Sequence, residues 1–585
     1  MEYPIVYVTA DAVVSSLGFS TEASWKKMID NQSGITKTHN PMLYFQPFLS
    51  AQISDVELQK QIEKYKLSDF TRLEQLFILV IQQTLNKCDI DVTSSDCGLI
   101  ISSTKGNIVL LSVENEQGDE LFLTTLSEKV ASHFGFTSKP IVVCNACISG
   151  VSAMIVAKRL IENGTYKHVI VTGGDELSRF IVSGFHAFKS VSSEICKPYD
   201  ATRDGLSLGE ACGSMLLTSD RTKVSEIKPI CLLGGAISND ANHISGPSRT
   251  GEELSMAMTS ALNQADLQPK DISFVNAHGT ATLYNDEMES KALHLADMDK
   301  IPMQSLKSFL GHTLGASGIV EAIFCKKQIE EDIVLGIPNF EKNGVPFPLN
   351  ISAKHRQMEL SHCMKTASGF GGSNAALILG KEPDCKKSFS QNNIKTKILL
   401  HSKIDKQGVQ LDGEKIVPYE KADTFATFIR KTYSFLKLDY RKFYKMDDLS
   451  KLGFIATECL LNSSDDFANA NPEKKGIIVA NRSASLNTDI NYCRNINTVG
   501  DYEASPAIFV YTLPNVMLGE VCIRWKIKGE NTFFIQNKPN FDFLMNYAKI
   551  AMQEQNMKYC IIGWCDLLKE EFEANFWLVK RTNIN

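Results

Sequence analysis

One stretch of this 585-residue sequence reads Ile141-Val-Val-Cys-Asn-Ala-Cys-Ile-Ser-Gly-Val-Ser-Ala-Met-Ile-Val-Ala-Lys-Arg-Leu-Ile161. Its first residues are apolar and β-branched, which is typical of a strand buried on both faces. Residues 151–161 predict a buried helix, and small residues separate it from the strand. Similar apolar runs at 98–102, 168–172 and 272–276 alternate with helical patterns. The sequence therefore predicts an α/β protein whose sheets are covered by helices.

Composition and charge exclude several classes of protein. Hydrophobic residues make up 43% and charged residues 22%, as in globular proteins. The net charge of −6 gives no support for nucleic-acid or anionic-membrane binding. Fifteen irregularly spaced cysteines form no disulfide framework, so we expect reduced thiols. No apolar run reaches the roughly 18 residues of a membrane span, and no basic segment opens a signal peptide. We therefore expect a cytoplasmic protein.

The chain shows a polar linker and a weak internal repeat. Residues 381–397 are rich in lysine and turn formers and hold Pro383, which favours a linker. Beyond it, Gly476-Ile-Ile-Val-Ala480 matches Gly98-Leu-Ile-Ile-Ser102, and Asp566 aligns with Asp175. A repeat of this kind indicates one supersecondary unit used twice. The second copy ends at about the point where the first is half finished.

Cys147 lies at a strand-to-helix turn, where several interpretations are open. A helix N-terminus favours the thiolate, the nucleophilic form of a cysteine. A buried structural cysteine is the usual alternative. A redox or metal pair with Cys144 is another, although no second pair with ligand spacing follows. The turn by itself does not decide among them.

Three further segments carry residue types suited to catalysis. His278 follows an apolar strand within Asn276-Ala-His-Gly-Thr-Ala-Thr282, where it could face a cleft or be an ordinary turn histidine. Lys307 and His312 precede a helix that contains Glu321, and Lys307 and Glu321 could simply be an ion pair. The glycine-rich Ser368–Asn374 lacks the lysine of a phosphate-binding loop. Together these residues suit acyl transfer followed by decarboxylation.

Residues 1 to about 380 resemble a complete elongating β-ketoacyl-acyl-carrier-protein synthase of the thiolase superfamily. The motifs occur in the order of that family and cover nearly the whole segment. Its Cys–His–His set favours the elongating over the initiating type. Beside the Cys147 turn, the matching motifs are Gly173-Gly-Asp-Glu176, Tyr199-Asp-Ala-Thr-Arg-Asp-Gly205 with Gly209-Glu210, His278-Gly-Thr-Ala-Thr282 with Asn285-Asp286 and Glu289, Lys307-Ser-Phe-Leu-Gly-His312, and Gly369-Phe-Gly-Gly372.

The resemblance implies a role for each residue of the site. Cys147 is the nucleophile, and the N–H groups of Cys147 and Phe370 form the oxyanion hole. His278 and His312 promote decarboxylation of malonyl-carrier protein, and Lys307, paired with Glu321, orients the site. Phe370 is a gate, and Thr280, Thr282 and Gly371 lie along the bound substrate. No metal or organic cofactor is expected, because phosphopantetheine belongs to the acyl-carrier-protein substrate.

The resemblance also implies the domain organisation. We expect a thiolase-like five-layered αβαβα fold, with an N-terminal half (1–225) carrying the nucleophile and a C-terminal half (226–380) carrying the histidine and lysine motifs. After the linker, residues 398–585 resemble only an N-terminal half. The alignment places Lys538, followed by Pro539, opposite Cys147, and His401 is the last histidine of the chain. This unit is similar to small synthase-like proteins of aryl-polyene and flexirubin-type pathways and is expected to be non-catalytic, with a structural, chain-length-setting or carrier-docking role.

Two other functions compete with the condensing enzyme. A chain-length-factor-like partner of another synthase would lack the cysteine and one or both histidines, which the first unit retains. A thiolase would carry a second catalytic cysteine late in the chain instead of the Lys307–His312 motif. We therefore expect an enzyme of fatty-acid, polyketide or aryl-polyene-type synthesis that works with acyl carrier protein. By family resemblance it forms a homodimer or a heterodimer with a related subunit, near the strand before Cys147.

Overall fold

The computed structural model describes residues 4–116, 118–383, 394–462 and 464–582. The strand before Cys147, β5 (Ile141–Val143), lies in a sheet ordered β5-β4-β6-β8-β1. Its other members are β4 (Cys97–Ser102), β6 (His168–Asp175), β8 (Ala211–Thr218) and β1 (Val6–Ser15). Strands β5, β4 and β6 are parallel and almost wholly buried, as their apolar runs predict.

A second sheet follows along the chain and faces the first. It is ordered β9-β16-β15-β10-β11-β13. The start of β1 also pairs with β9, so the two sheets meet at that edge. The strands are β9 (Ile230–Asn239), β16 (Ser373–Lys381), β15 (His362–Gly369), β10 (Phe274–Asn276), β11 (Pro302–Gln304) and β13 (Asn350–Ile351).

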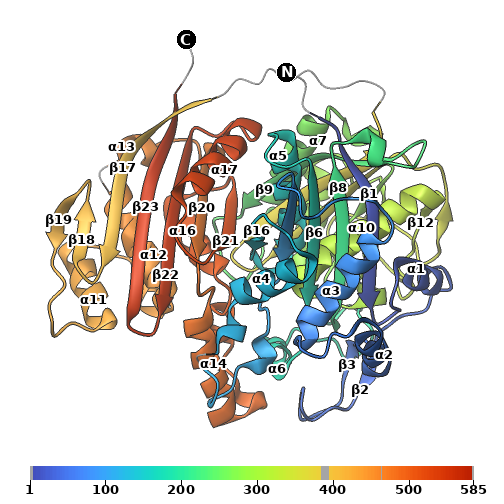
Figure 1. Ribbon diagram of the computed structural model, residues 1–585, viewed down its shortest axis with the longest axis horizontal. Coiled ribbons are helices and arrows are strands. Elements are labelled where there is room, and N and C mark those ends of the chain that lie inside the picture. Colours follow the sequence, from blue (N-terminus) through green and yellow to red (C-terminus); the bar gives the residue numbers. More distant parts are fainter. Residues whose placement is uncertain (1–3, 117, 384–393, 463, 583–585) are drawn as a thin grey trace.

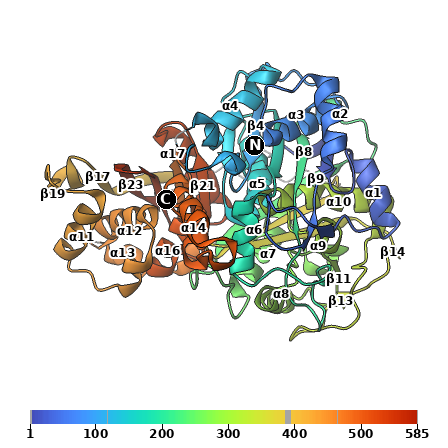
Figure 2. The ribbon, with the colours of Figure 1, turned by 90° about the horizontal axis from the view of Figure 1, so that it is seen from below.

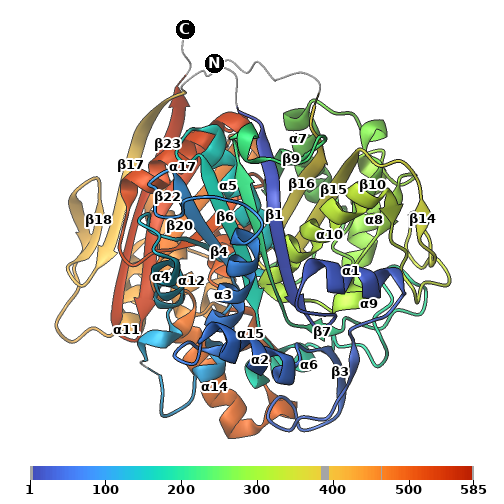
Figure 3. The ribbon, with the colours of Figure 1, turned by 45° about the vertical axis from the view of Figure 1, so that its right-hand side comes forward.

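Helices cover both sheets and fill the space between them. Helices α5 and α10 contact strands of both sheets and form the central layer, whereas α3 packs outside the first sheet and α7 outside the second (Figure 3). This is the expected five-layered αβαβα arrangement. The helices are α3 (Arg72–Leu85), α5 (Ser149–Glu162), α7 (Glu252–Ala265), α8 (Leu283–Leu295) and α10 (Ser317–Glu331).

Residues 395–582, called here the second unit, form a sheet of their own on one side of residues 4–381, the first unit (Figures 1 and 2). Its strand order, β21-β20-β22-β23-β17, repeats that of β5-β4-β6-β8-β1. Helices α12 and α16 pack on one face of this sheet and α17 on the other. The elements are β17 (Lys395–Asp405), α12 (Asp448–Leu461), β20 (Lys475–Asn481), α16 (Asn515–Trp525), β21 (Asn531–Ile535), α17 (Phe541–Glu554), β22 (Tyr559–Leu568) and β23 (Glu571–Thr582).

A pair of equivalent aspartates shows how closely the two halves correspond. Asp175, at the end of β6, accepts hydrogen bonds from the backbone N–H and hydroxyl of Thr104 in the turn after β4. Asp566, at the equivalent place in β22, accepts from the backbone N–H groups of Arg482 and Ser483 in the turn after β20. An aspartate at the same position therefore holds the equivalent turn in each unit.

The two units join through their sheets. β21 runs antiparallel to β5, with Phe534 opposite Val143 and Ile535 opposite Val142. The N–H of Cys144 donates to Phe533 O (3.0 Å). Val143 and Phe534 hold equivalent positions in the two units, 391 residues apart, and they lie opposite each other. The two paired strands are therefore related by an approximate two-fold axis. One continuous set of strands and one large apolar cluster thus span both units.

The remaining elements connect these layers. The helices are α1 (Thr21–Ile29), α2 (Asp55–Tyr65), α4 (Leu123–Phe134), α6 (Arg179–Ala187), α9 (Lys307–Leu310), α11 (Phe425–Phe435), α13 (Asp465–Ala468), α14 (Leu486–Val499) and α15 (Pro506–Val510). The strands are β2 (Thr36–Thr38), β3 (Phe48–Ala51), β7 (Leu208–Gly209), β12 (Ile333–Val334), β14 (Arg356–Gln357), β18 (Gly408–Leu411) and β19 (Glu414–Val417).

The ends of the predicted linker fall within regular structure. β16 ends at Lys381 and β17 begins at Lys395, and residues 384–393 lie outside the described residues. The first strand of the second unit thus begins three positions before the expected start of that unit at 398, because Lys395–Lys397 pair with Lys580–Thr582. Within the described ranges, no helix combines the length and apolar character needed to cross a bilayer.

Candidate active site

The chain turns sharply between β5 and α5, and this turn presents Cys147. Ala146 has a left-handed φ of 46°, a conformation that costs free energy in a residue other than glycine. The Ser149 hydroxyl accepts from Asn145 N–H (2.8 Å) and donates to Ala146 O (2.6 Å), which holds the turn closed. Cys147 is half-buried at the N-terminal end of α5.

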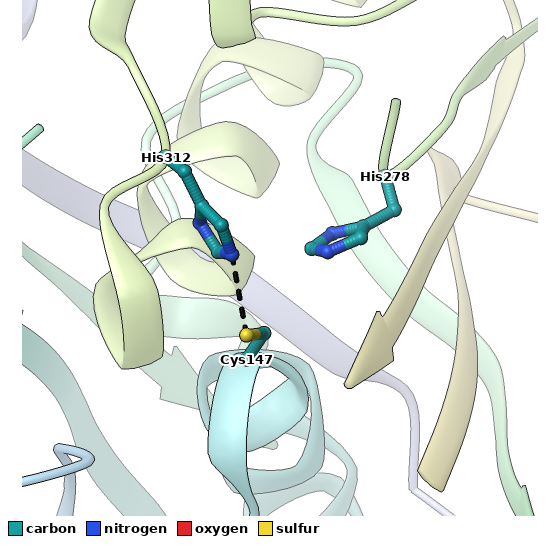
Figure 4. A group of neighbouring side chains, drawn as sticks. All are labelled: Cys147, His278 and His312. Atoms are coloured by element: carbon teal, nitrogen blue, oxygen red, sulfur yellow. Dashed lines mark hydrogen bonds between the residues drawn. The ribbon is translucent and has the colours of Figure 1, made fainter. Parts of the chain in front are cut away.

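Two histidines from the second sheet converge on the cysteine (Figure 4). Nε2 of His312 lies 3.2 Å from Sγ of Cys147. The rings of His278 and His312 are nearly perpendicular, with centroids 5.2 Å apart. One ligand atom from each of the three residues lies within 4.8 Å of the others. The structure thus gathers three residues that are separated by up to 165 positions in the sequence.

The backbone around His312 sets its orientation and its tautomer. Its N–H donates to Ser207 O (2.7 Å), and the preceding Gly311 has a positive φ of 68°. The N–H of Leu314 donates to Nδ1 of the ring (3.2 Å). Because a backbone N–H can only donate, Nδ1 must accept, and the proton of the neutral ring is on Nε2. His312 therefore presents an N–H toward the cysteine.

His278 follows β10 and is held through its backbone. The N–H groups of His278 and Gly279 donate to the carboxylate of Glu289 in α8, at 2.8 and 2.7 Å. Tyr199 OH donates to the same carboxylate (2.8 Å). Among the described residues, Nδ1 of the buried His278 has no hydrogen-bond partner. Glu289 thus anchors this loop and leaves the imidazole free to face Cys147.

Below the histidines lies a buried cluster of two lysines and one carboxylate. Glu321 in α10 accepts from Lys307 and from Lys365, each at 2.5 Å. All three side chains are almost completely buried. The predicted pair of Lys307 and Glu321 is therefore present, and Lys365 extends it to a triad with one excess positive charge.

Burial and this positive charge determine the protonation states. Burial lowers the pKa of His278 and of His312 well below the usual value, and Lys307 lowers both further, so both imidazoles are neutral at pH 7. Burial also raises the pKa of the Cys147 thiol to about 12, although Lys307 opposes the shift. Desolvation therefore favours the thiol, in opposition to the helix N-terminus and Lys307, which favour the thiolate.

The glycine-rich segment forms the β15–β16 turn and lies beside the cysteine. A Cβ on Gly369 would lie 3.1 Å from Cys147 N, so the turn approaches the nucleophile closely. The ring of half-buried Phe370 stacks on Phe185 of α6, with centroids 6.4 Å apart. Gly371 has a positive φ of 86°, and its N–H donates to Ile244 O (2.6 Å). The segment is a structural turn at the site, not a phosphate loop.

The other residues that the sequence singled out do not all belong to the site around Cys147. Thr280 and Thr282 share a hydrogen bond (2.8 Å) in the loop that carries His278. Cys144, in contrast, is fully buried, and its Sγ contacts Thr104 O (3.6 Å) instead of pairing with Cys147. Lys538 is exposed at the turn after β21. Cys144 and Cys147 are both free thiols, so the structure gives no support to a redox pair.

Sequence reasoning missed Lys365 and gave no role to Asp175 or Glu289. Lys365 is a single lysine inside the apolar strand 362–369, a signal of a buried charge that needs a partner. Cys147, His278 and His312 also offer a set of atoms that could bind a metal ion. The absence of a metal therefore stays a prediction.

Comparisons with known proteins identify the first unit. The model of the β-ketoacyl synthase N-terminal domain matches residues 4–223, and that of the C-terminal domain matches residues 230–341. A 3-oxoacyl-[acyl-carrier-protein] synthase 2 of Staphylococcus aureus is 25% identical over 406 residues, covering 64% of this chain and 98% of the relative. The synthase 2 of Vibrio harveyi is 27% identical, with the same coverage.

Solved structures extend the similarity of fold to both units. A structure described as PfaC keto synthase–chain length factor has a TM-score of 0.77 at 16% identity and covers 99% of this chain and 78% of its own. The ishigamide ketosynthase/chain length factor has a TM-score of 0.60 at 23% identity, covering 65% of this chain and 100% of its own. With its two domains in order and its cysteine and histidines assembled, the chain belongs to the β-ketoacyl synthase family of condensing acyltransferases.

Proposed function

We propose that this chain condenses an acyl group on Cys147 with malonyl-acyl-carrier protein to give 3-oxoacyl-acyl-carrier protein and carbon dioxide. The observation that carries the proposal is the contact of Nε2 of His312 with Sγ of Cys147 (3.2 Å), with His278 beside it. A thiol nucleophile and two neutral N–H donors suit a reaction that passes through an acyl-enzyme and an enolate.

In the first half-reaction, Cys147 attacks the thioester carbonyl of an acyl carrier protein. The new C–S bond forms to Sγ, and the old bond to the carrier sulfur breaks. The thiol proton of Cys147 ends on the released carrier thiol, which suits a cysteine whose pKa is raised by burial. The N–H groups of Cys147 and Phe370 are the proposed donors to the tetrahedral oxyanion.

In the second half-reaction, malonyl-carrier protein occupies the site, with its pantetheine arm near Thr280, Thr282 and Gly371. Loss of carbon dioxide leaves an enolate whose oxygen accepts from Nε2–H of His312 and from His278. A neutral imidazole suits this role because it carries one N–H that can donate a hydrogen bond to the enolate oxygen. The enolate carbon then forms a bond to the carbonyl carbon of the acyl-enzyme, the bond from that carbon to Sγ breaks, and the released thiolate takes up a proton from solvent. No organic cofactor is needed, since the pantetheine arm belongs to the substrate.

For the second unit we propose a non-catalytic, chain-length-factor-like role. The structural neighbour that covers 99% of this chain is described as a keto synthase–chain length factor. The exposed Lys538 stands where the first unit has Cys147, and no histidine follows His401 in the sequence. A purely non-catalytic function for the whole chain is disfavoured by the intact cysteine and histidines. Fatty-acid, polyketide and aryl-polyene-type chains are the candidate products.

The nucleophile is tested by intact mass spectrometry after mixing with acyl-carrier protein. Cys147→Ala should form no acyl-enzyme, whereas wild type should gain the mass of one acyl group. The matched control is Cys144→Ala, three residues away and fully buried, which should acylate like wild type. Normal acylation of the Cys147 variant would disprove the assignment. Comparing saturated with polyenoyl carriers then identifies the preferred chain.

A further inference from the structure

The loop that carries Phe370 is held from the second unit as well as from its own. The side-chain amide Nδ2 of Asn515, in the first turn of α16, donates to Phe370 O (2.8 Å). Asn515 is fully buried. We propose that Asn515 is a positioning residue for the Phe370 loop, so that the second unit takes part directly in the condensation. This inference rests on the proposed function of the Cys147 site.

Close packing shows that the loop and α16 are built to fit each other. A Cβ on Gly519, one turn after Asn515, would lie 2.6 Å from Gly371 O. A Cβ on Gly371 would lie 2.7 Å from Nδ2 of Asn515. Glycine is therefore needed on both sides of this contact, and the helix backbone approaches the loop directly.

A second asparagine of the same unit holds the other end of the loop. Oδ1 of Asn531, in β21, accepts from Ser373 Oγ (2.6 Å) and from Nδ2 of Asn239 (3.2 Å). Asn239 also donates to Gly371 O (2.9 Å). The carbonyl groups of Phe370 and Gly371 are thus both fixed by a network that crosses the interface between the units.

The amide of Asn515 is oriented by this one interaction. Among the described residues, its buried Oδ1 has no partner. The opposite orientation would place Oδ1 against Phe370 O, two acceptors facing each other. A buried acceptor left without a partner costs free energy, so packing alone does not explain the residue.

The two-fold relation between the units strengthens the inference. The position 391 residues before Asn515 is Thr124, in the first turn of α4. Thr124 thus stands in the first unit at the position that Asn515 holds in the second. The amide that donates to Phe370 O is therefore present in the second unit and is not repeated at the equivalent position of the first.

The expected effect is on turnover, because the Phe370 carbonyl fixes the peptide plane beside the proposed oxyanion donor. Asn515→Ala should lower kcat of condensation about tenfold, equivalent to about 1.4 kcal/mol, with KM for malonyl-carrier protein within about twofold. The matched control is Asn497→Ala. It removes another hydrogen bond between the units, which Nη1 of Arg179 donates to Oδ1 of Asn497 (3.1 Å), and should leave both constants unchanged.

The variant Asn515→Asp supplies a readout that a purely structural role would not change. A protonated carboxyl can donate to Phe370 O, whereas a carboxylate repels it. The kcat of this variant should therefore fall as pH rises through the carboxyl pKa, which burial raises, while wild type and Asn515→Ala show no such step.

These measurements distinguish a failure of the Asn515 inference from a failure of the proposed function. Wild-type kcat in Asn515→Ala, or the same pH profile for Asn515→Asp and Asn515→Ala, would overturn the inference. An inactive wild-type enzyme would instead overturn the proposed function. Thermal melting of each variant shows whether it is folded. If Asn515→Ala does not fold, the pH profile of Asn515→Asp decides alone.

Discussion

At the scale of single residues, the site is controlled by buried charge. Glu321 lies between Lys307 and Lys365, and the three together leave a net positive charge close to both histidines. This charge lowers the pKa of each imidazole beyond the effect of burial and partly offsets the effect of burial on Cys147. The triad therefore helps to keep the histidines neutral, so that each ring has one N–H that can donate to an enolate oxygen.

Removing the shared carboxylate tests the triad. Glu321→Gln would leave two buried ammonium groups without a counter-charge, so we expect the free energy of unfolding to fall by about 3–5 kcal/mol. Urea denaturation followed by circular dichroism measures this change. The control Glu57→Gln removes an exposed partner of Lys60 and should leave the midpoint unchanged. A wild-type midpoint for Glu321→Gln would mean that the lysines are not charged.

At the scale of elements, two junctions position the site. The sharp turn between β5 and α5 presents the cysteine, and the β15–β16 turn brings Phe370 beside it. A third contact lies between the units, where Lys105, in the segment after β4, meets Asp489 of α14 (2.7 Å) and Ser485 (3.2 Å). Both charged residues are buried, and burial raises the pKa of Asp489 to about 6 although Lys105 opposes the shift.

A double-mutant cycle measures how this buried pair links the units. Lys105→Met or Asp489→Leu alone should destabilise the protein by about 3–5 kcal/mol, because each leaves a buried charge unpaired. The double variant should recover most of that loss. The control is Arg494→Gln, which breaks a more exposed pair between the units, with Glu116, and should not shift the urea midpoint. Additive losses in the cycle would contradict the pairing.

At the scale of the whole molecule, one chain contains a contact of the kind expected between subunits. The strand before the nucleophile, β5, was expected near an interface, and its edge pairs with β21 of the same chain. The pairs around Val143 and Phe534 follow the approximate two-fold symmetry of an isologous dimer contact. The second unit thus supplies β21, which occupies that edge of β5.

This arrangement predicts the oligomeric state. Because β21 already occupies the edge of β5, two copies cannot pair through it, and sedimentation velocity of the purified chain should give a particle near 65.0 kDa. A particle of twice that mass would show that another surface joins two copies. Dilution over a hundredfold range of concentration separates a stable dimer from a transient one.

The sequence by itself determined the fold class, the motifs and the repeat, because these depend on local order. Short apolar runs rich in β-branched residues, such as 98–102 and 168–172, become buried strands as predicted. The motif residues Cys147, His278, Lys307, His312 and Phe370 were all identifiable, since each lies in a recognisable segment. The sequence also showed that the second unit lacks an equivalent cysteine, because Lys538 occupies that position.

Only the tertiary structure decided which side chains meet and in what protonation state. Lys365 joins Glu321 from a strand 44 positions away, and Asn515 reaches Phe370 from 145 positions away. Contacts of this kind depend on packing between distant segments, which local patterns do not encode. The pKa of the Cys147 thiol depends on the tertiary structure for the same reason. The helix N-terminus is a local feature, whereas desolvation results from every layer that closes over the thiol.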